Sequence, residues 1–295
     1  TVAMDVLAVE ASGTAAHIFG PSSSIDFAGT WTGNAPALCA LWRLDATACA
    51  PLRTAALGGR FDVGGQATAP VLHAEAAVDD LRAPDGSAIR ANGVAVVSAS
   101  GVALPRVDIR ALGGHVFLRD AAVDLGARTA EGSVAWNGVG LRALARVTGT
   151  STPIAAITDG HAVFRGDPTD LARLMVDGAA TVAPAATAGV PLDGRVRFQL
   201  KTGRWSTRLT GRFATIAVDG VVTGRLQPSR RWRSMPIAGS LAVRAVDVAE
   251  AATMLRLLGV LERDQTVPAW PARATATIGL TATFCSPVLS QHPLI

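Results

Sequence analysis

The residues best suited to chemistry in this chain are its five histidines, and none of them lies in a catalytic spacing. Long stretches of sequence separate His17, His73, His115, His161 and His292. The zinc-protease motif HExxH and the hydrolase motif GxSxG are both absent from the sequence. We therefore predict no catalytic residue and no enzymatic activity.

The acids and glycines support the same prediction. Asp79-Asp80 ends an expected strand and Asp159-Gly160 occupies an expected turn, where carboxylates are usually solvated or cap the backbone. The glycine pairs Gly58-Gly59 and Gly64-Gly65 do not form the GxGxxG fingerprint of a dinucleotide-binding fold. We expect no cofactor.

Two of the three cysteines are a candidate disulfide. Cys39 and Cys49 share the same strand parity and would face each other across a hairpin centred near Leu44. Two free, half-buried thiols are the alternative. No cysteines have the CxxC spacing of a zinc site, so we predict no bound metal.

The elements that position these residues are strands, as residues 195–226 show most clearly. Apolar and polar side chains alternate on both sides of the turn Thr202-Gly203 and again after Ala214. Side chains of a strand point to opposite faces with a period of two, so this stretch is a meander with one apolar face and one basic face. The central question for this protein is what the apolar face contacts.

The composition favours many short strands over long helices. The chain has 30 glycines and 16 prolines, no tyrosine, and only 5% aromatic residues. The net charge is +4, and the basic residues are spread along expected strand faces. This distribution argues against a nucleic-acid-binding patch. Contact with anionic lipid headgroups fits it better. No 18-residue stretch is apolar and free of charges, so no helix is expected to span a membrane.

We predict an all-β fold with a few short helices, built from consecutive, mostly antiparallel hairpins. Residues 1–57 form a weakly patterned β segment, residues 58–283 form a repeating β region, and residues 284–295 form an unpatterned or truncated tail. Helical spacing and capping residues predict short helices near 141–148, 167–177 and 247–258.

Three features of residues 58–283 resemble a known family. One is the phrase from Gly65 to Ala74 that contains Pro70 and Leu72. The second is an LxxL step before a glycine and a new strand, which occurs at Leu141-Leu144, Leu171-Leu174 and Leu255-Leu258. The third is the segment Val190-Pro191-Leu192-Asp193-Gly194, which leads into the meander. In these features the chain resembles the TamB/AsmA-like superfamily of bacterial envelope proteins, and we expect it to be an internal fragment of such a protein.

The resemblance implies a fold, a ligand and a location. Members of this superfamily form an elongated β-groove, or β-taco, with an apolar inner face. The groove is thought to carry phospholipid or related lipids across the periplasm between the inner and outer membranes, and one branch is associated with outer-membrane assembly. The implied partners are an envelope lipid and an outer-membrane insertase or other envelope protein, with an inner-membrane anchor outside this sequence and no nucleic acid.

The physics of lipid transfer agrees with this implication. An acyl chain in water costs about 0.8 kcal/mol per CH₂ group, or roughly 13 kcal/mol for sixteen carbons, and an apolar trough removes most of this cost. Alternating alanines leave room for such chains where a packed core would need bulk; they are Ala74, Ala76, Ala91 and Ala95. We therefore predict a lipid conduit of the Gram-negative cell envelope. Its predicted groove-lining residues are Val196, Phe198, Leu200, Trp205, Leu209 and Ile216.

Other interpretations stay open. The six lining residues fit equally into a sandwich core that packs against another sheet. A β-solenoid or sandwich surface protein that acts by adhesion would need a regular repeat and polar ladders, yet asparagine occurs only at Asn34, Asn92 and Asn137. A glycan-acting enzyme on a β scaffold would need a cluster of acids and aromatic residues that the sequence does not show.

Overall fold

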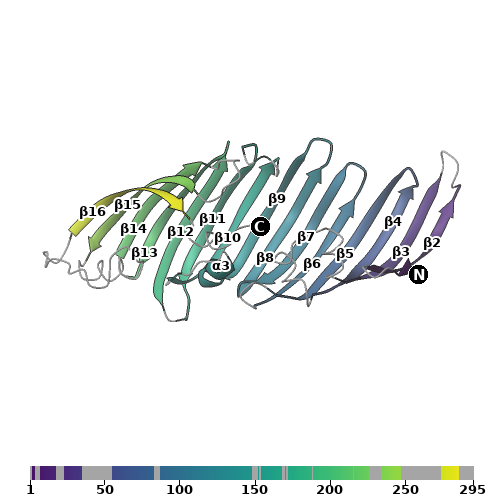
Figure 1. Ribbon diagram of the computed structural model, residues 1–295, viewed down its shortest axis with the longest axis horizontal. Helices are drawn as coiled ribbons and strands as arrows, with labels where there is room; N and C mark the ends of the chain where they lie inside the picture. The colour runs from purple at the N-terminus through teal and green to yellow at the C-terminus, as the bar shows by residue number, and fades with distance from the viewer. Residues whose placement is uncertain are drawn as a thin grey trace, which may run out of the picture. The chain divides into compact units, whose positions relative to one another are not determined.

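The computed structural model of this chain divides into two compact units, residues 1–137 and 138–295. It describes residues 2–3, 7–17, 23–34, 55–82, 87–147, 152, 154–167, 170, 172–187, 189–214, 216–225, 234–246 and 274–285. Nearly all of these residues are in strands, which Figure 1 shows together with the one described helix.

The first unit is a ladder of antiparallel strands that pair in sequence order. Its members are β1 (Val2–Ala3), β2 (Leu7–Ala16), β3 (Ser24–Asn34), β4 (Ala56–Gln66), β5 (Ala69–Arg82), β6 (Ala88–Val97), β7 (Gly101–Ala111), β8 (Gly114–Asp124) and the larger part of β9 (Thr129–Gly140). Each strand from β2 onward pairs with its successor over most of its length.

The second unit repeats this arrangement after the short helix α3 (Leu141–Val147). Its strands are β10 (Ile154–Gly166), β11 (Met175–Pro184), β12 (Val190–Lys201), β13 (Arg204–Phe213), β14 (Ile216–Arg225), β15 (Ser234–Val246) and β16 (Ala274–Cys285). They too pair antiparallel in sequence order.

One parallel contact breaks the pattern of the second unit. Strand β11 ends at Pro184, and beyond that point its two neighbours pair directly, Ile154 with Val190 and Ala155 with Pro191. The sheet is therefore drawn together at this end of β10 and β12.

Tight hairpin turns explain why neighbouring strands pair in this order. Thr202 and Gly203 between β12 and β13 have φ angles of 50° and 69°, and Leu112 and Gly113 between β7 and β8 have φ angles of 56° and 78°. Two left-handed central residues give the turn whose twist matches that of the flanking strands. The predicted turn at Thr202-Gly203 is confirmed, and the turn at Leu112-Gly113 ends where β8 begins at Gly114.

The predicted fold class is confirmed: the described chain is all-β with one short helix, and its consecutive antiparallel strands form an open sheet. Neither the parallel coils of a β-solenoid nor the second sheet of a sandwich occurs among the described residues. No helix in these ranges is long and apolar enough to cross a membrane.

Several local predictions need correction. The helix near 141–148 is present as α3, but the one near 167–177 is wrong. Asp170 instead closes a single tight turn, because the backbone N–H groups of Arg173 and Leu174 donate to its carbonyl oxygen, and β11 begins at Met175. Asp159-Gly160 is not a turn but lies inside β10. The helix near 247–258 lies outside the described residues.

The predicted segment boundaries also shift. Residue 57 is no boundary, because β4 begins at Ala56 and pairs with β3 along its whole length. The predicted tail 284–295 begins inside β16, whose last residue is Cys285, and its remainder lies outside the described residues.

A small hydrophobic core lies only in the second unit among the described residues, at the end where β10 and β12 meet. Its members come from β10 to β14 and are Ala156, Val182, Val190, Leu192, Phe213, Ile216 and Val218. The described hydrophobic residues of the first unit include just two buried ones, Ala121 and Ala130. Most of the fold is therefore held by backbone pairing and by side chains that are half-buried on one face.

Candidate functional site

Strand register collects the apolar side chains of the second unit on one face. Directly paired residues of an antiparallel ladder point to the same side. Val196 pairs with Leu209, and Leu200 pairs with Trp205 on one side and Val176 on the other. Phe198 and Ile216 share this parity, so all six residues predicted to line a groove lie on this apolar face.

Two rows of this apolar face lie farthest from the core, and we call them the outer rows. Each row crosses the strands at right angles to their direction. The first comprises Phe164, Val176, Leu200 and Trp205, and the second comprises Ala162, Gly178, Phe198, Thr207 and Val222.

Burial divides the six predicted residues into three groups. Ile216 is 1% exposed and lies inside the core, so it lines no open surface. Val196 and Leu209 pack against the edge of that core. Phe198, Leu200 and Trp205 belong to the outer rows and are half-exposed. The outer rows are therefore the part of the apolar face that a ligand can reach.

Aromatic rings lie flat over glycines of the neighbouring strand on this face. A Cβ atom placed on Gly224 would lie 2.5 Å from the indole nitrogen of Trp205, and one on Gly178 would overlap the Phe198 ring. Trp31 covers Gly59 of the first unit in the same way, 2.9 Å from such a Cβ. A ring that covers a glycine shields the backbone there, and it projects less from the surface of the sheet. The sequence did not reveal these pairs, because they depend on cross-strand register.

The apolar face of the first unit has both small and large side chains, with Phe61, Leu72 and Ile89 among the large ones. Trp31 of β3 is followed across the next strands by Gly59, Ala76, Gly93 and Val107. The four alanines predicted to leave room for a ligand lie on this same face and are half-buried; they are Ala74, Ala76, Ala91 and Ala95.

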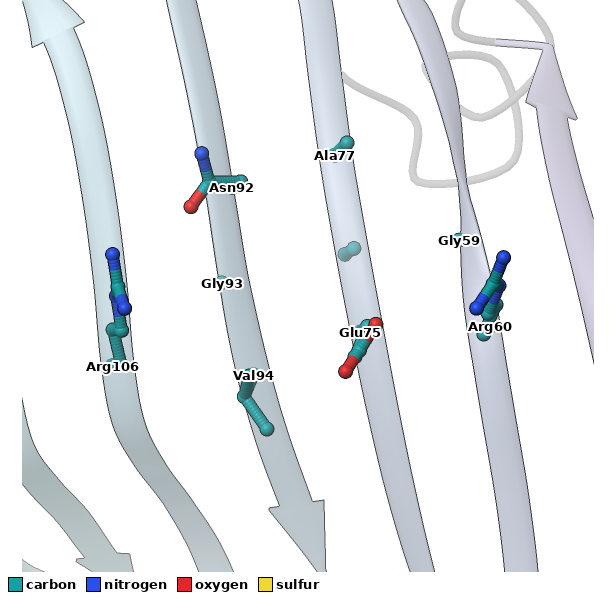
Figure 2. A pocket seen from close by; sticks show the side chains of 9 residues that line it. Gly59, Arg60, Glu75, Ala77, Asn92, Gly93, Val94 and Arg106 are labelled. Atoms are coloured by element: carbon teal, nitrogen blue, oxygen red, sulfur yellow. The ribbon is translucent and has the colours of Figure 1, made fainter.

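The opposite, polar face of the first unit has a shallow hollow of about 490 Å³. Figure 2 shows its polar lining residues on four successive strands, with Arg60 on β4, Glu75 on β5, Asn92 on β6 and Arg106 on β7. Ala77 makes room because its side chain is short. These four residues are of mixed charge, and we see no pairing of an acid with a base and a nucleophile among them.

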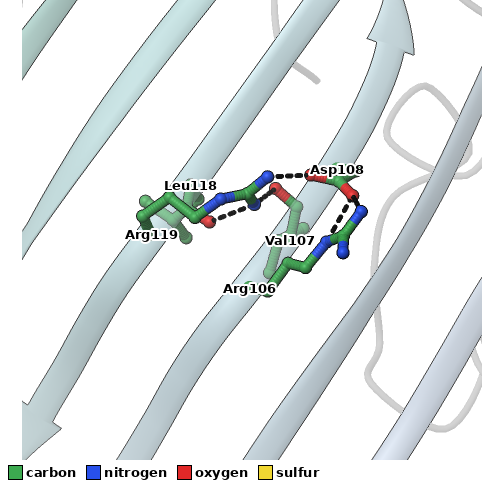
Figure 3. Close-up of polar contacts among 5 residues, drawn as sticks. All are labelled: Arg106, Val107, Asp108, Leu118 and Arg119. Atoms are coloured by element: carbon green, nitrogen blue, oxygen red, sulfur yellow. Dashed lines mark hydrogen bonds and ion pairs between the residues drawn. The ribbon is translucent and has the colours of Figure 1, made fainter.

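The most tightly bound acid of the polar face is Asp108 on β7. Arg106 donates from Nε to Oδ2 at 2.7 Å, and Arg119 Nη2 lies 2.7 Å from Oδ1, as Figure 3 shows. These two arginines, Arg106 first, hold the pKa of the Asp108 carboxyl below its usual range. Arg119 also donates to the carbonyl oxygens of Leu118 and Val107 and lies 5.2 Å from the centre of the Phe117 ring. Oδ1 meets Arg119 as an ion pair but accepts no hydrogen bond from the described residues. This ionised carboxylate is suited to fixing β7 to β8, not to proton transfer.

The histidines and cysteines do not assemble into a site in the described part of the chain. His73, His115 and His161 all lie on the polar face, each on a different strand. No group of three or more histidine, cysteine or acidic residues in the described ranges could hold a metal ion. The candidate disulfide partners Cys39 and Cys49 lie outside the described residues.

Comparison of the chain with protein-family models, with curated proteins and with solved structures finds no match. The resemblance to the TamB/AsmA-like superfamily therefore rests on the residue patterns alone. The candidate functional site is the apolar face, above all its outer rows in the second unit.

Proposed function

We propose that this protein is a lipid conduit whose apolar face carries the acyl chains of phospholipid or a related envelope lipid. The observation that carries the proposal is that the outer rows keep large apolar side chains half-exposed on an open sheet, although Ala162 and Gly178 of the second row are buried; the half-exposed ones are Phe164, Val176, Phe198, Leu200 and Trp205. The one described element outside the sheet, α3, packs on β10, and its Leu141 lies against the core. An apolar surface that the described fold leaves accessible is typical of a ligand or partner site.

The size of the outer rows suits an extended hydrocarbon chain. The first row crosses four strands, which at about 4.8 Å per strand gives a path of about 14 Å. A chain on this path would contact Phe164, Val176, Leu200 and Trp205 in turn. The flat rings over Gly178 and Gly224 keep the path free of protruding side chains, so a chain can move along it without being held tightly.

The proposed setting comes from the sequence resemblance. It places the protein in the periplasm, with lipid moving between the inner and outer membranes and with an envelope protein, such as an outer-membrane insertase, as a further partner. No catalytic step and no cofactor belong to this proposal.

Photo-crosslinking tests the proposal directly. A photoreactive amino acid replaces Phe198 or Leu200 in the outer rows, and the protein is incubated with radiolabelled phospholipid and irradiated. We expect lipid adducts at these two positions. With monomeric phosphatidylcholine, which has no net charge, as the labelled lipid, the polar-face positions Arg197 of β12 and Arg208 of β13 should give none.

A second control separates ligand contact from general stickiness. Leu192 is buried in the core on the same face of β12 and should also give no adduct. Equal labelling of apolar and polar positions, or no labelling at all, would rule out a lipid conduit.

A further inference from the structure

The polar face of β12–β14 is strongly basic, in contrast to every other described polar face of the chain. Its two acids are Asp193 and Asp219. Its seven cations, all exposed, are Arg195, Arg197, Lys201, Arg204, Arg208, Arg212 and Arg225. The excess of five charges on three strands exceeds the net charge of +4 of the whole chain. We call this surface the basic face.

The cations of the basic face are arranged against the stability of the sheet. Arg197 lies directly opposite Arg208, and Arg204 lies between Lys201 on one side and Arg225 on the other. Like charges at directly opposed positions destabilise a strand pair. The first unit also has opposed arginines, Arg90 with Arg110 and Arg106 with Arg119, but there Asp79 and Asp108 offset the repulsion. On the basic face an external negative charge can take this part.

The basic face also has few internal acid partners. Arg208 pairs with Asp219 at 3.1 Å, and among the described residues the other six cations form no ion pair. On the first unit, by contrast, Arg90 pairs with Asp79, and Arg106 and Arg119 both pair with Asp108. Two adjoining hollows of about 420 and 410 Å³ share Arg197, Ala179 and His161. Asp177 and the ion-paired Arg208 also line the first, and Arg195 and Asp159 also line the second.

We propose that the basic face docks on an anionic lipid surface, with its arginines on headgroup phosphates. Guanidinium groups bind phosphate oxygens with two parallel hydrogen bonds, and cations at a membrane surface attract anionic headgroups over about a Debye length. A single-stranded nucleic acid fits less well because it needs aromatic platforms for its bases. The aromatic residues of these strands, Phe198, Trp205 and Phe213, all lie on the opposite face.

This docking is independent of lipid transfer along the apolar face. It adds a second surface, the basic face, through which the protein contacts lipid. The polar face of the first unit has no such excess of cations. Acids outnumber arginines along β2–β9: the acids are Glu10, Asp26, Asp62, Glu75, Asp79, Asp80, Asp108, Asp120, Asp124 and Glu131, and the arginines are Arg60, Arg82, Arg90, Arg106, Arg110 and Arg119. The second unit, and specifically β12–β14, is therefore the part that meets the membrane surface.

Vesicle co-sedimentation of the full chain tests this docking. We expect binding to vesicles that contain phosphatidylglycerol, no binding to pure phosphatidylcholine vesicles, and loss of binding at high salt. The variant Arg197→Gln/Arg204→Gln/Arg225→Gln should bind about a hundredfold more weakly, since each cation near such a surface contributes roughly a factor of five.

The matched control is Arg60→Gln/Arg90→Gln/Arg110→Gln on the polar face of the first unit, which removes the same charge and should bind as the unchanged protein does. Equal losses in both variants, no loss in either, or binding to phosphatidylcholine alone would overturn the proposal. So would tighter binding of a single-stranded oligonucleotide than of anionic vesicles at about 150 mM salt.

Thermal unfolding should show the first variant to be at least as stable as the unchanged protein. Lipid crosslinking at Phe198 with monomeric lipid reports on the conduit separately.

Discussion

The two units of this protein use the same strand ladder but distribute burial and charge differently. In the first unit no hydrophobic core forms among the described residues, and two acids of the polar face, Asp79 and Asp108, pair with arginines. In the second unit a core has formed around Ile216, Leu200 and Trp205 stay half-exposed in the outer rows, and six of the seven cations of the basic face form no ion pair among the described residues. The difference shows that the same strand ladder can form with a hydrophobic core or without one, and with its cations paired or unpaired.

The core is the feature whose loss should have the largest effect. Ile216→Ala removes a side chain that is 1% exposed, and cavity formation at such a site costs about 2–5 kcal/mol of unfolding free energy. The matched control Ile109→Ala, at a half-buried position of the apolar face in the first unit, should cost about 1 kcal/mol.

Chemical denaturation measures both values, and hydrogen exchange locates them. Protection should fall in β12–β14 for Ile216→Ala and remain unchanged in β4–β6. Equal costs at the two positions would mean that the second unit gains no special stability from its core.

Rings over glycine should give an intermediate effect. Gly224→Ala forces the Trp205 ring away from the backbone, and overpacking of this kind costs about 1–3 kcal/mol. Gly64→Ala is the control, because a Cβ there meets nothing within 4 Å. We expect its stability in urea to be unchanged or slightly raised. If Gly224→Ala were also neutral, the flat ring would not be a constraint of this face.

The smallest effect should come from the ion pairs of the first unit, through pH. The pKa of Asp108 is lowered in the folded state, so its contribution is present above the unfolded pKa of about 3.9 and disappears as the pH falls toward the folded value. Asp108→Asn should therefore lower the urea midpoint at pH 7, and the difference from the unchanged protein should shrink below about pH 4.

Asp62→Asn is the matched control for this comparison, since Asp62 lies exposed on the same face and forms no ion pair among the described residues. It should change the midpoint less than Asp108→Asn does. An Asp108→Asn deficit that is the same at pH 3 and pH 7 would show that lost packing, not lost charge, is responsible.

Much of the fold could be predicted because a strand reveals its two faces in its own sequence. The alternation in β12 and β13 correctly placed Val196, Phe198 and Leu200 opposite Arg197 and Gln199. The helix near 167–177 failed because capping residues at Asp167 and Asp170 are equally suited to a tight turn. The strand pairing of Met175–Pro184 with both neighbours then outweighed local helix preference.

The candidate site was predicted in part. Parity alone put all six lining residues on one face, but it could not separate Ile216 in the core from Leu200 in the outer rows. That distinction follows from the parallel contact of Ile154 with Val190, which joins residues far apart in the chain. The basic character of these strands was visible, yet the like-charge pair of Arg197 and Arg208 needed the register.

The sequence by itself determined that this chain is a strand ladder with an apolar and a polar face, because side-chain alternation and turn residues are local properties of the backbone. Only the tertiary structure decided where the sheet is drawn together, which apolar residues stay open and which cations lie side by side. These depend on pairings between strands, and hydrophobic packing and charge repulsion act between neighbours in space, not between neighbours in sequence.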